Sequence, residues 1–225
     1  MLLTIPDLLD STQLDSVRRF LAQARFVDGR LSAGSAAAKV KQNLELDREQ
    51  PGRDKLLEAL MAALYARAEF RFAAYPARVA TPLFARYVPG MAYGEHVDDP
   101  LMGGGPGQQY RSDIALTLFL NDPESYAGGE LVVTTAFGEQ QVKLPAGHLV
   151  LYPASSRHRV APVTAGERLV MVTWLQSQVR DPARRELLYD LWRAREQLLA
   201  AAPDDPATRR VDTSYVNLLR MWAEP

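Results

Sequence analysis

The first third of the chain places apolar residues three or four positions apart, the spacing of helices with one buried face. The first such run follows cap-forming residues near Asp10, where Thr12 and Asp15 stand at the spacing of a capping box. A second helix is predicted over about residues 54–70. The apolar positions that share a face in these runs are Leu14, Val17, Leu21 and Ala24, then Leu56, Leu57, Leu60, Leu64 and Ala68.

From about residue 78 the pattern changes to short runs of apolar and β-branched residues separated by glycine and proline. Short strands at such close spacing predict a sandwich, a jelly roll or a barrel. One connector, residues 100–109, contains four glycines and is either a lid beside a site or a plain crossover loop. The expected strands cover residues 83–88, 93–98, 113–120, 130–135, 139–144, 148–152, 158–163 and 168–176.

The chain returns to helical spacing after Asp181-Pro182, and Asp205-Pro206 begins a second terminal helix. The sequence therefore predicts three regions in an α+β protein. Residues 1–77 form an N-terminal helical support, residues 78–178 form the β domain, and residues 179–225 form a C-terminal helical extension.

Charge and composition narrow the function classes. The chain has 26 Lys and Arg against 27 Asp and Glu, so a broad basic surface for nucleic acid or an anionic membrane is not expected. It has no cysteine, which excludes disulfides, iron–sulfur clusters and thiol chemistry. Neither a signal peptide nor a long apolar span is evident, and a cytoplasmic location is expected.

Two of the three histidines stand where a metal site would need them. His96 and Asp98 lie two apart on an expected strand and so point to one face, whereas Asp99 points away. His158 begins another expected strand and would supply a third ligand. Two imidazoles and one carboxylate that leave open positions suit non-haem Fe(II).

Other interpretations stay open at this stage. A His-x-Asp pair on a strand is common by chance, and His148 competes with His158 as the third ligand. The sequence around His158 and its spacing from Arg168 favour His158, which leaves His148 as a partly exposed turn residue. Tyr87 could donate a hydrogen bond in the site or simply pack in the core.

Arg168 begins the strand after that of His158, across a tight turn at residues 164–167, and an even number of positions separates the two. A buried arginine without an acidic partner needs an anion, and its planar guanidinium fits a carboxylate. The competing interpretation is a surface arginine paired with Glu167 or Glu139.

These residues resemble those of the iron- and 2-oxoglutarate-dependent dioxygenases, which have a double-stranded β-helix fold. Several longer segments resemble, more closely, the bacterial PKHD-type hydroxylases, relatives of prolyl hydroxylases. The segments are MLLTIPDLL, FVDGRLSAG, RYVPGMAYGEHVDDP, SDIALTLFLNDPESYAGGEL and LVLYPASSRHRVAPVTAGER.

The resemblance implies a jelly-roll core flanked by N-terminal and C-terminal helices. It implies His96, Asp98 and His158 as iron ligands and Arg168 as the residue that holds the distal carboxylate of 2-oxoglutarate. It also implies Fe(II), O2 and L-ascorbate as a reductant. The expected activity is hydroxylation of a C–H bond in a peptide, protein or amino-acid-like substrate, with succinate and CO2 as coproducts.

Two other functions are compatible with the same residues. One is a non-catalytic sensor that binds iron and 2-oxoglutarate and acts through a protein partner, and the other is a cupin-like metal enzyme that does not use 2-oxoglutarate. The sequence does not name the substrate. A homodimer is one expected assembly, because closed symmetric pairs are the commonest.

Overall fold

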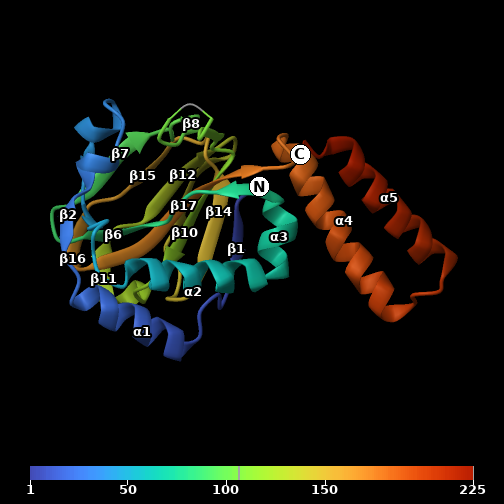
Figure 1. The fold of residues 1–225 in the computed structure, drawn as a ribbon, viewed down its shortest axis with the longest axis horizontal. Helices are drawn as coiled ribbons and strands as arrows, with labels where there is room; N and C mark the ends of the chain where they lie inside the picture. The colour runs from blue at the N-terminus through green and yellow to red at the C-terminus, as the bar shows by residue number, and fades with distance from the viewer. Residues whose placement is uncertain (106, 225) are drawn as a thin grey trace.

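The computed structural model describes residues 1–105 and 107–224. Two sheets face each other, and helices lie against the outer face of the larger sheet (Figure 1). Between the sheets, Ala115 and Phe119 of one meet Leu131 and Val160 of the other in a buried apolar cluster. Two packed antiparallel sheets with flanking helices form the α+β jelly roll that the sequence predicts.

The larger sheet is built from strands that come from the whole length of the chain. They are β1 (Leu3–Ile5), β2 (Phe26–Asp28), β4 (Leu44–Leu46), β5 (Pro76–Val79), β6 (Leu83–Tyr87), β10 (Ile114–Phe119), β14 (Leu149–Pro153) and β17 (Arg168–Ser177). Their order is β1-β14-β10-β17-β6-β4-β2, and β5 pairs with the far end of β17. Because β1, β2 and β4 belong to the first 77 residues, that region contributes strands as well as the helices that its pattern predicts.

The smaller sheet has the order β13-β12-β15-β7-β3. Its strands are β3 (Lys41–Gln42), β7 (Ala92–His96), β12 (Leu131–Thr135), β13 (Gly138–Val142) and β15 (His158–Val160). Two short ribbons join β11 (Tyr126–Gly128) to β16 (Val163–Gly166) and β8 (Leu101–Met102) to β9 (Tyr110–Arg111). The second ribbon carries the glycine-rich connector, whose residue 106 lies outside the described residues.

The helices occupy both ends of the chain, with three short 3-10 turns between strands. They are α1 (Ser11–Ala22), α2 (Arg53–Ala66), α3 (Ala68–Ala74), α4 (Pro182–Ala201) and α5 (Pro206–Trp222), with η1 (Gly29–Ser32), η2 (Ala37–Lys39) and η3 (Pro123–Ser125). Among the helices of the described residues, none combines the length and the apolar character needed to cross a bilayer.

Two helix expectations need correction. The capping box of α1 is formed by Asp10 and Gln13, not by Thr12 and Asp15. The helix expected over 54–70 is broken at Arg67, whose backbone is extended. This break lets the Arg67 guanidinium donate to the carbonyls of Pro6 and Asp7 and places Phe70 of α3 in the core.

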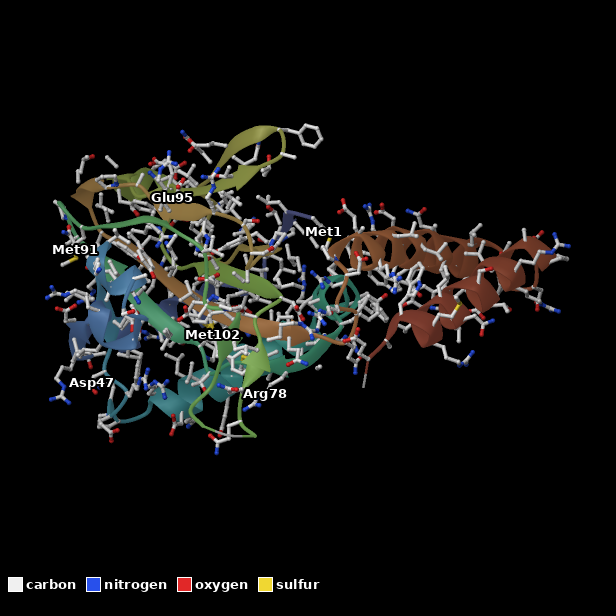
Figure 2. All side chains as sticks on the ribbon, turned by 90° about the horizontal axis from the view of Figure 1, so that it is seen from above. Met1, Asp47, Arg78, Met91, Glu95 and Met102 are labelled. Carbon is white, nitrogen blue, oxygen red and sulfur yellow. The ribbon has the colours of Figure 1, made fainter. Side chains whose placement is uncertain are left out.

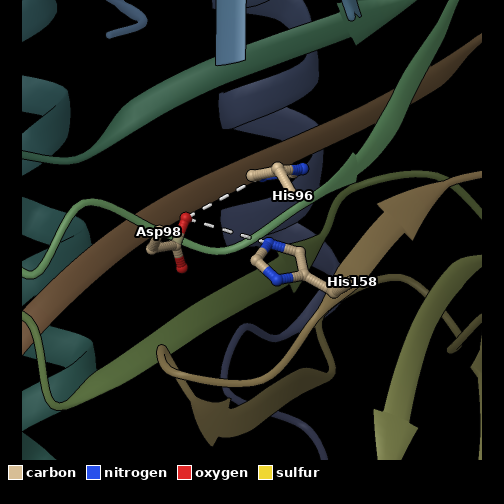
Figure 3. A group of neighbouring side chains, drawn as sticks. All are labelled: His96, Asp98 and His158. Atoms are coloured by element: carbon tan, nitrogen blue, oxygen red, sulfur yellow. Dashed lines mark ion pairs between the residues drawn. The ribbon is translucent and has the colours of Figure 1, made fainter. Parts of the chain in front are cut away.

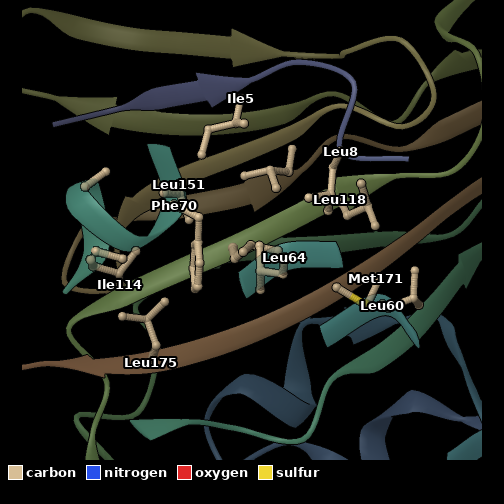
Figure 4. Close-up of a cluster of buried hydrophobic side chains, with 14 of the residues drawn as sticks. Ile5, Leu8, Leu60, Leu64, Phe70, Ile114, Leu118, Leu151, Met171 and Leu175 are labelled. Atoms are coloured by element: carbon tan, nitrogen blue, oxygen red, sulfur yellow. The ribbon is translucent and has the colours of Figure 1, made fainter. Parts of the chain in front are cut away.

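Strand alternation gives the larger sheet two different faces. In β10, Leu116 and Leu118 point outward to the helices, whereas Ala115, Thr117 and Phe119 point between the sheets. Figure 4 shows Leu60 and Leu64 of α2 and Phe70 of α3 lying against this outward face. The helices therefore cover one face with apolar contacts and leave the other face free to line a site.

The two terminal helices form a hairpin that projects from the sheets (Figure 1). It is fixed to α3 through Tyr75, whose hydroxyl lies 2.9 Å from that of Tyr215 in α5. Between the two helices, Arg195 donates to Asp212 at 2.6 Å. This hairpin is an addition to the jelly roll and takes no part in its sheets.

Candidate metal and cosubstrate site

His96, Asp98 and His158 converge between the two sheets. His96 ends β7 and His158 begins β15, and the antiparallel pairing of these strands sets the two histidines directly opposite each other. Asp98 follows two residues after His96. Its Oδ1 lies 3.9 Å from Nε2 of His96 and 3.8 Å from Nε2 of His158 (Figure 3). One ligand atom from each residue falls within 4.8 Å of the others, the spacing of a site that could hold one metal ion.

The other ring nitrogens of both histidines are held by backbone carbonyls. Nδ1 of His96 lies 2.8 Å from the carbonyl oxygen of Gly94, and Nδ1 of His158 lies 3.0 Å from that of Ser156. A carbonyl only accepts, so each Nδ1 carries the hydrogen and each Nε2 presents a lone pair. The ring of Tyr93 stacks on His96 with centroids 3.7 Å apart, which further fixes its orientation.

Electrostatics around the triad favour a bound cation. Burial and, as a smaller cause, the neighbouring His158 lower the pKa of His96 to about 4, so this imidazole is neutral at pH 7. Burial raises the pKa of Asp98, although His158 and the indole N–H of Trp174 oppose that shift. Oδ2 of Asp98 is buried without a hydrogen-bond partner. Two imidazoles that direct Nε2 at one point and a carboxylate oxygen without a partner are a donor set that fits a divalent metal.

Arg168 is the second unsatisfied group between the sheets. It is 2% exposed, it has no carboxylate partner among the described residues, and its Nε lacks an acceptor. Its guanidinium lies over the rings of Tyr87 and Phe119, at 5.0 and 5.7 Å from their centroids. The two acidic residues that could have paired with it are engaged elsewhere, Glu167 with Arg86 and Glu139 with Arg159.

The expected hairpin between His158 and Arg168 is wrong. His158 lies in the smaller sheet and Arg168 in the larger one, and between them β16 pairs with β11. The chain therefore crosses from one sheet to the other between the two residues. Both nevertheless line the same cavity of about 760 Å³, together with Tyr87, Thr117 and Tyr152.

Sequence reasoning missed one part of this cavity. It is lined by Lys41 of β3, Glu45 of β4 and Asn43 between the two strands, and all three are buried. Lys41 Nζ lies 2.5 Å from Glu45 Oε1, and Ser32 Oγ contacts both groups. Residues 41, 43 and 45 are two apart and are buried, whereas residues 42 and 44 between them are more exposed. Hydrophobic patterning could not detect this alternation because the buried positions are polar.

The remaining candidates lie elsewhere or play other parts. His148 stands beside Asp7, with Nε2 and Oδ1 3.9 Å apart, and does not line the cavity. Asp99 lines the cavity but is exposed and does not join the triad. In the short strand β9, Tyr110 lines the cavity, whereas Arg111 is bound to Asp113 at 2.6 Å.

Comparison with known proteins shows the family of this chain. A 2OG-Fe(II) oxygenase superfamily model matches residues 82–176, and a PKHD-type hydroxylase C-terminal domain model matches residues 182–224. A PKHD-type hydroxylase of Thioalkalivibrio sulfidiphilus is 54% identical over 224 residues, which is the full length of both chains. The chain belongs to the PKHD-type hydroxylase family. A Synechococcus elongatus member is 48% identical over the same span. The protein is therefore a 2-oxoglutarate-dependent dioxygenase, as its resemblance implied.

Solved structures of more distant proteins share the fold. A prolyl hydroxylase from Trichoplax adhaerens superposes with a TM-score of 0.57 at 18% identity, covering 83% of this chain and 86% of its own. A prolyl-4-hydroxylase from Pseudomonas putida gives 0.54 at 22% identity, covering 78% and 92%. These likenesses confirm the jelly-roll prediction.

Proposed function

We propose that this PKHD-type hydroxylase uses Fe(II) bound by His96, Asp98 and His158 to hydroxylate a C–H bond of a peptide, protein or amino-acid-like substrate. Each turnover would consume 2-oxoglutarate and O2 and release succinate and CO2. The observation that carries the proposal is the His-Asp-His triad in the same cavity as an unpaired, buried arginine. Bound iron would supply the activation of O2, and the protein's residues supply its placement.

Arg168 and Tyr87 would orient the cosubstrate. The Arg168 guanidinium matches the distal carboxylate of 2-oxoglutarate in charge and planar shape. Burial raises the pKa of Tyr87 to about 12, so its hydroxyl keeps its proton and donates a hydrogen bond at neutral pH. The rings of Tyr87 and Phe119 beside the guanidinium keep its plane fixed and exclude water from that end.

The charges in this arrangement balance. Fe(II) with Asp98 carries one positive charge, 2-oxoglutarate brings two negative charges, and Arg168 returns the total to zero. A neutral total is what a buried cavity accommodates at least cost. Removal of Arg168 would leave a net negative centre and an unpaired carboxylate.

Succinate formation tests the proposal. The protein would be loaded with Fe(II) and 2-oxoglutarate without oxygen, exposed to O2, and assayed for succinate beside His158→Ala and Arg168→Ala. We expect slow uncoupled succinate formation by the wild type, its loss in His158→Ala and a sharp fall in Arg168→Ala. Equal metal binding and turnover in all three proteins would overturn the site assignment. Binding of both ligands without succinate would favour the sensor function instead.

Several finer points stay predictions. L-ascorbate as a reductant, a cytoplasmic location and a homodimer follow from the resemblance and from general expectation alone. The three-region division, with residues 78–178 as the catalytic domain, is likewise proposed.

A further inference from the structure

Three arginines besides Arg168 line the cavity. Arg48 follows β4, Arg53 begins α2 and Arg78 lies in β5, and all three line the cavity. Figure 2, seen from above, labels Arg78 near Met102 of β8. The contacts agree, since the Arg78 guanidinium lies 5.1 Å from the ring centroid of Tyr110, whose hydroxyl contacts Met102.

Strand register places Arg78 at the opposite end of β17 from Arg168. Arg168 begins β17 and pairs with Tyr87, whereas Arg78 pairs with Gln176 near the end of β17. Those eight positions of extended strand span about 26 Å. β4 runs antiparallel to β6, so it also leads away from Arg168 and toward Arg48. Arg78 and Arg168 therefore line the cavity from opposite ends of β17.

The two other cations of the lining, Arg168 and Lys41, have partners. Lys41 is neutralised by Glu45, and, on the proposed function, Arg168 is neutralised by 2-oxoglutarate and Asp98 by iron. The other charged residues of the lining are three cations, Arg48, Arg53 and Arg78, and one anion, Asp99.

The partners of the three remaining arginines are weak. Arg78 donates only to the carbonyl of Gln109, at 3.5 Å, among the described residues. Arg53 contacts Asp54 at 3.2 Å, but the Asp54 side chain is 89% exposed, so water screens the pair. Arg48 has no hydrogen bond or ion pair in the described part of the chain. These three arginines, called the rim below, thus make their part of the lining positive although the chain as a whole carries a net charge of -1.

We propose that Arg48, Arg53 and Arg78 select a substrate that carries an anionic group, either a carboxylate or a phosphate. This inference rests on the proposed function, because it assigns substrate to the cavity that would hold iron and 2-oxoglutarate. Guanidinium groups bind both anions through paired N–H donors, and charges of one sign that line a cavity raise the local concentration of a ligand of opposite charge. With its anion at the rim, the substrate extends inward and presents its C–H bond to the metal.

Three capped pentapeptides with a central alanine flanked by glutamate, phosphoserine or lysine serve as probes. They are titrated calorimetrically into protein loaded with redox-inert Zn(II) and 2-oxoglutarate, at about 50 mM and about 300 mM NaCl, to vary electrostatic screening. We expect at least one anionic peptide to bind at least about tenfold more tightly than the lysine peptide, with the difference shrinking at high salt. The tighter of the two anionic peptides identifies carboxylate or phosphate as the preferred group.

Substitutions test whether these arginines cause the preference for anionic peptides. Arg48→Glu with Arg78→Glu should weaken anionic peptide binding at least about tenfold, and the milder Arg78→Gln should weaken it less. The matched control is Arg193→Glu on α4, an exposed arginine that does not line the cavity, and it should bind as the wild type does. Equal binding of anionic and cationic peptides, or unchanged binding by both rim variants, would overturn the inference.

The wild type alone separates this inference from the proposed function. If it forms succinate from 2-oxoglutarate but shows no preference for anionic peptides, only the anion inference fails. If it neither binds 2-oxoglutarate nor forms succinate, the proposed function fails whatever the peptides do.

Discussion

The two faces of the larger sheet show how one set of strands serves both stability and chemistry. Along β17, Leu169 and Met171 face the helices and lie in a fully apolar cluster. Their neighbours Arg168, Val170 and Val172 face the other sheet, where buried polar atoms lack partners. The outer face is stabilised mainly by apolar contacts, whereas the inner face carries the buried Arg168, whose Nε lacks a hydrogen-bond partner.

This difference predicts that substitutions on the two faces separate stability from ligand binding. An outer residue should change the free energy of unfolding and leave the site alone. An inner polar residue should do the reverse, because its burial without a partner costs free energy in the unliganded protein.

The largest effect is expected for Leu118→Ala on the outer face. Leu118 is fully buried beneath the helices, and its truncation leaves a cavity that costs about 3 kcal/mol of unfolding free energy. Denaturant unfolding measures the loss, and calorimetry with Co(II) should show that the folded variant binds metal as the wild type does. A comparable loss of Co(II) affinity would show that the two faces are coupled.

On the inner face, Arg168→Met should have the opposite effects: higher stability and weaker ligand binding. Methionine fills similar space without a buried charge, so the unliganded protein should gain about 1 to 2 kcal/mol of stability. The affinity for 2-oxoglutarate should fall about 100-fold, equivalent to about 2.7 kcal/mol. The control Arg159→Met removes an arginine paired with Glu139 at the surface and should change neither quantity much. Lower stability in Arg168→Met would mean that the guanidinium already has a partner.

Gly129→Ala tests how closely the backbone supports Arg168. Gly129 has a φ of +70°, and a Cβ there would lie 3.1 Å from Cδ of Arg168, with side-chain atoms of Val163 and Tyr126 at 3.0 and 3.1 Å. The variant should lose about 1 to 2 kcal/mol of stability and bind 2-oxoglutarate several-fold more weakly. Gly90→Ala is the matched control, since its φ is +88° but nothing lies within 4 Å of the added Cβ. Equal losses of 2-oxoglutarate affinity in both variants would contradict the contact with Arg168.

The contrast between apolar and polar buried positions also explains which parts of the structure could be predicted from the sequence. Apolar periodicity located the long strands closely, as for β10, expected over 113–120 and found at Ile114–Phe119. The strand over 168–176 was equally well placed. These strands carry apolar residues on both faces, so their pattern is evident without knowledge of the fold.

The polar part of the cavity could not be found in this way. β3 and β4 are two and three residues long, and their buried positions include Lys41 and Glu45, which a hydrophobicity pattern takes for surface. The approach of Arg168 to the triad from the opposite sheet also depends on strand order, which local spacing does not determine. The triad itself was accessible because His96 and Asp98 are two residues apart on one extended segment.

The smallest predicted effect is a pH dependence that the outer face lacks. The pKa of His96 is about 4 in the folded protein and about 6.5 when unfolded, mainly because burial disfavours its charged form. The unfolded state therefore binds more protons between these values, so stability is complete above about pH 6.5 and falls as the pH drops toward 4. Between pH 7 and 6 the loss should be under about 1 kcal/mol.

Metal-free protein is the right sample, because a bound metal would itself compete with protons for His96. Unfolding at pH 7 and 6 should show a smaller loss in His96→Gln than in the wild type, and Leu118→Ala should retain the wild-type dependence. NMR of the three histidine rings should find His96 still neutral at pH 6. A His96 titration centred near the ordinary value would mean that water reaches the ring freely, and the inner face would then lack the burial on which its contrast with the outer face depends.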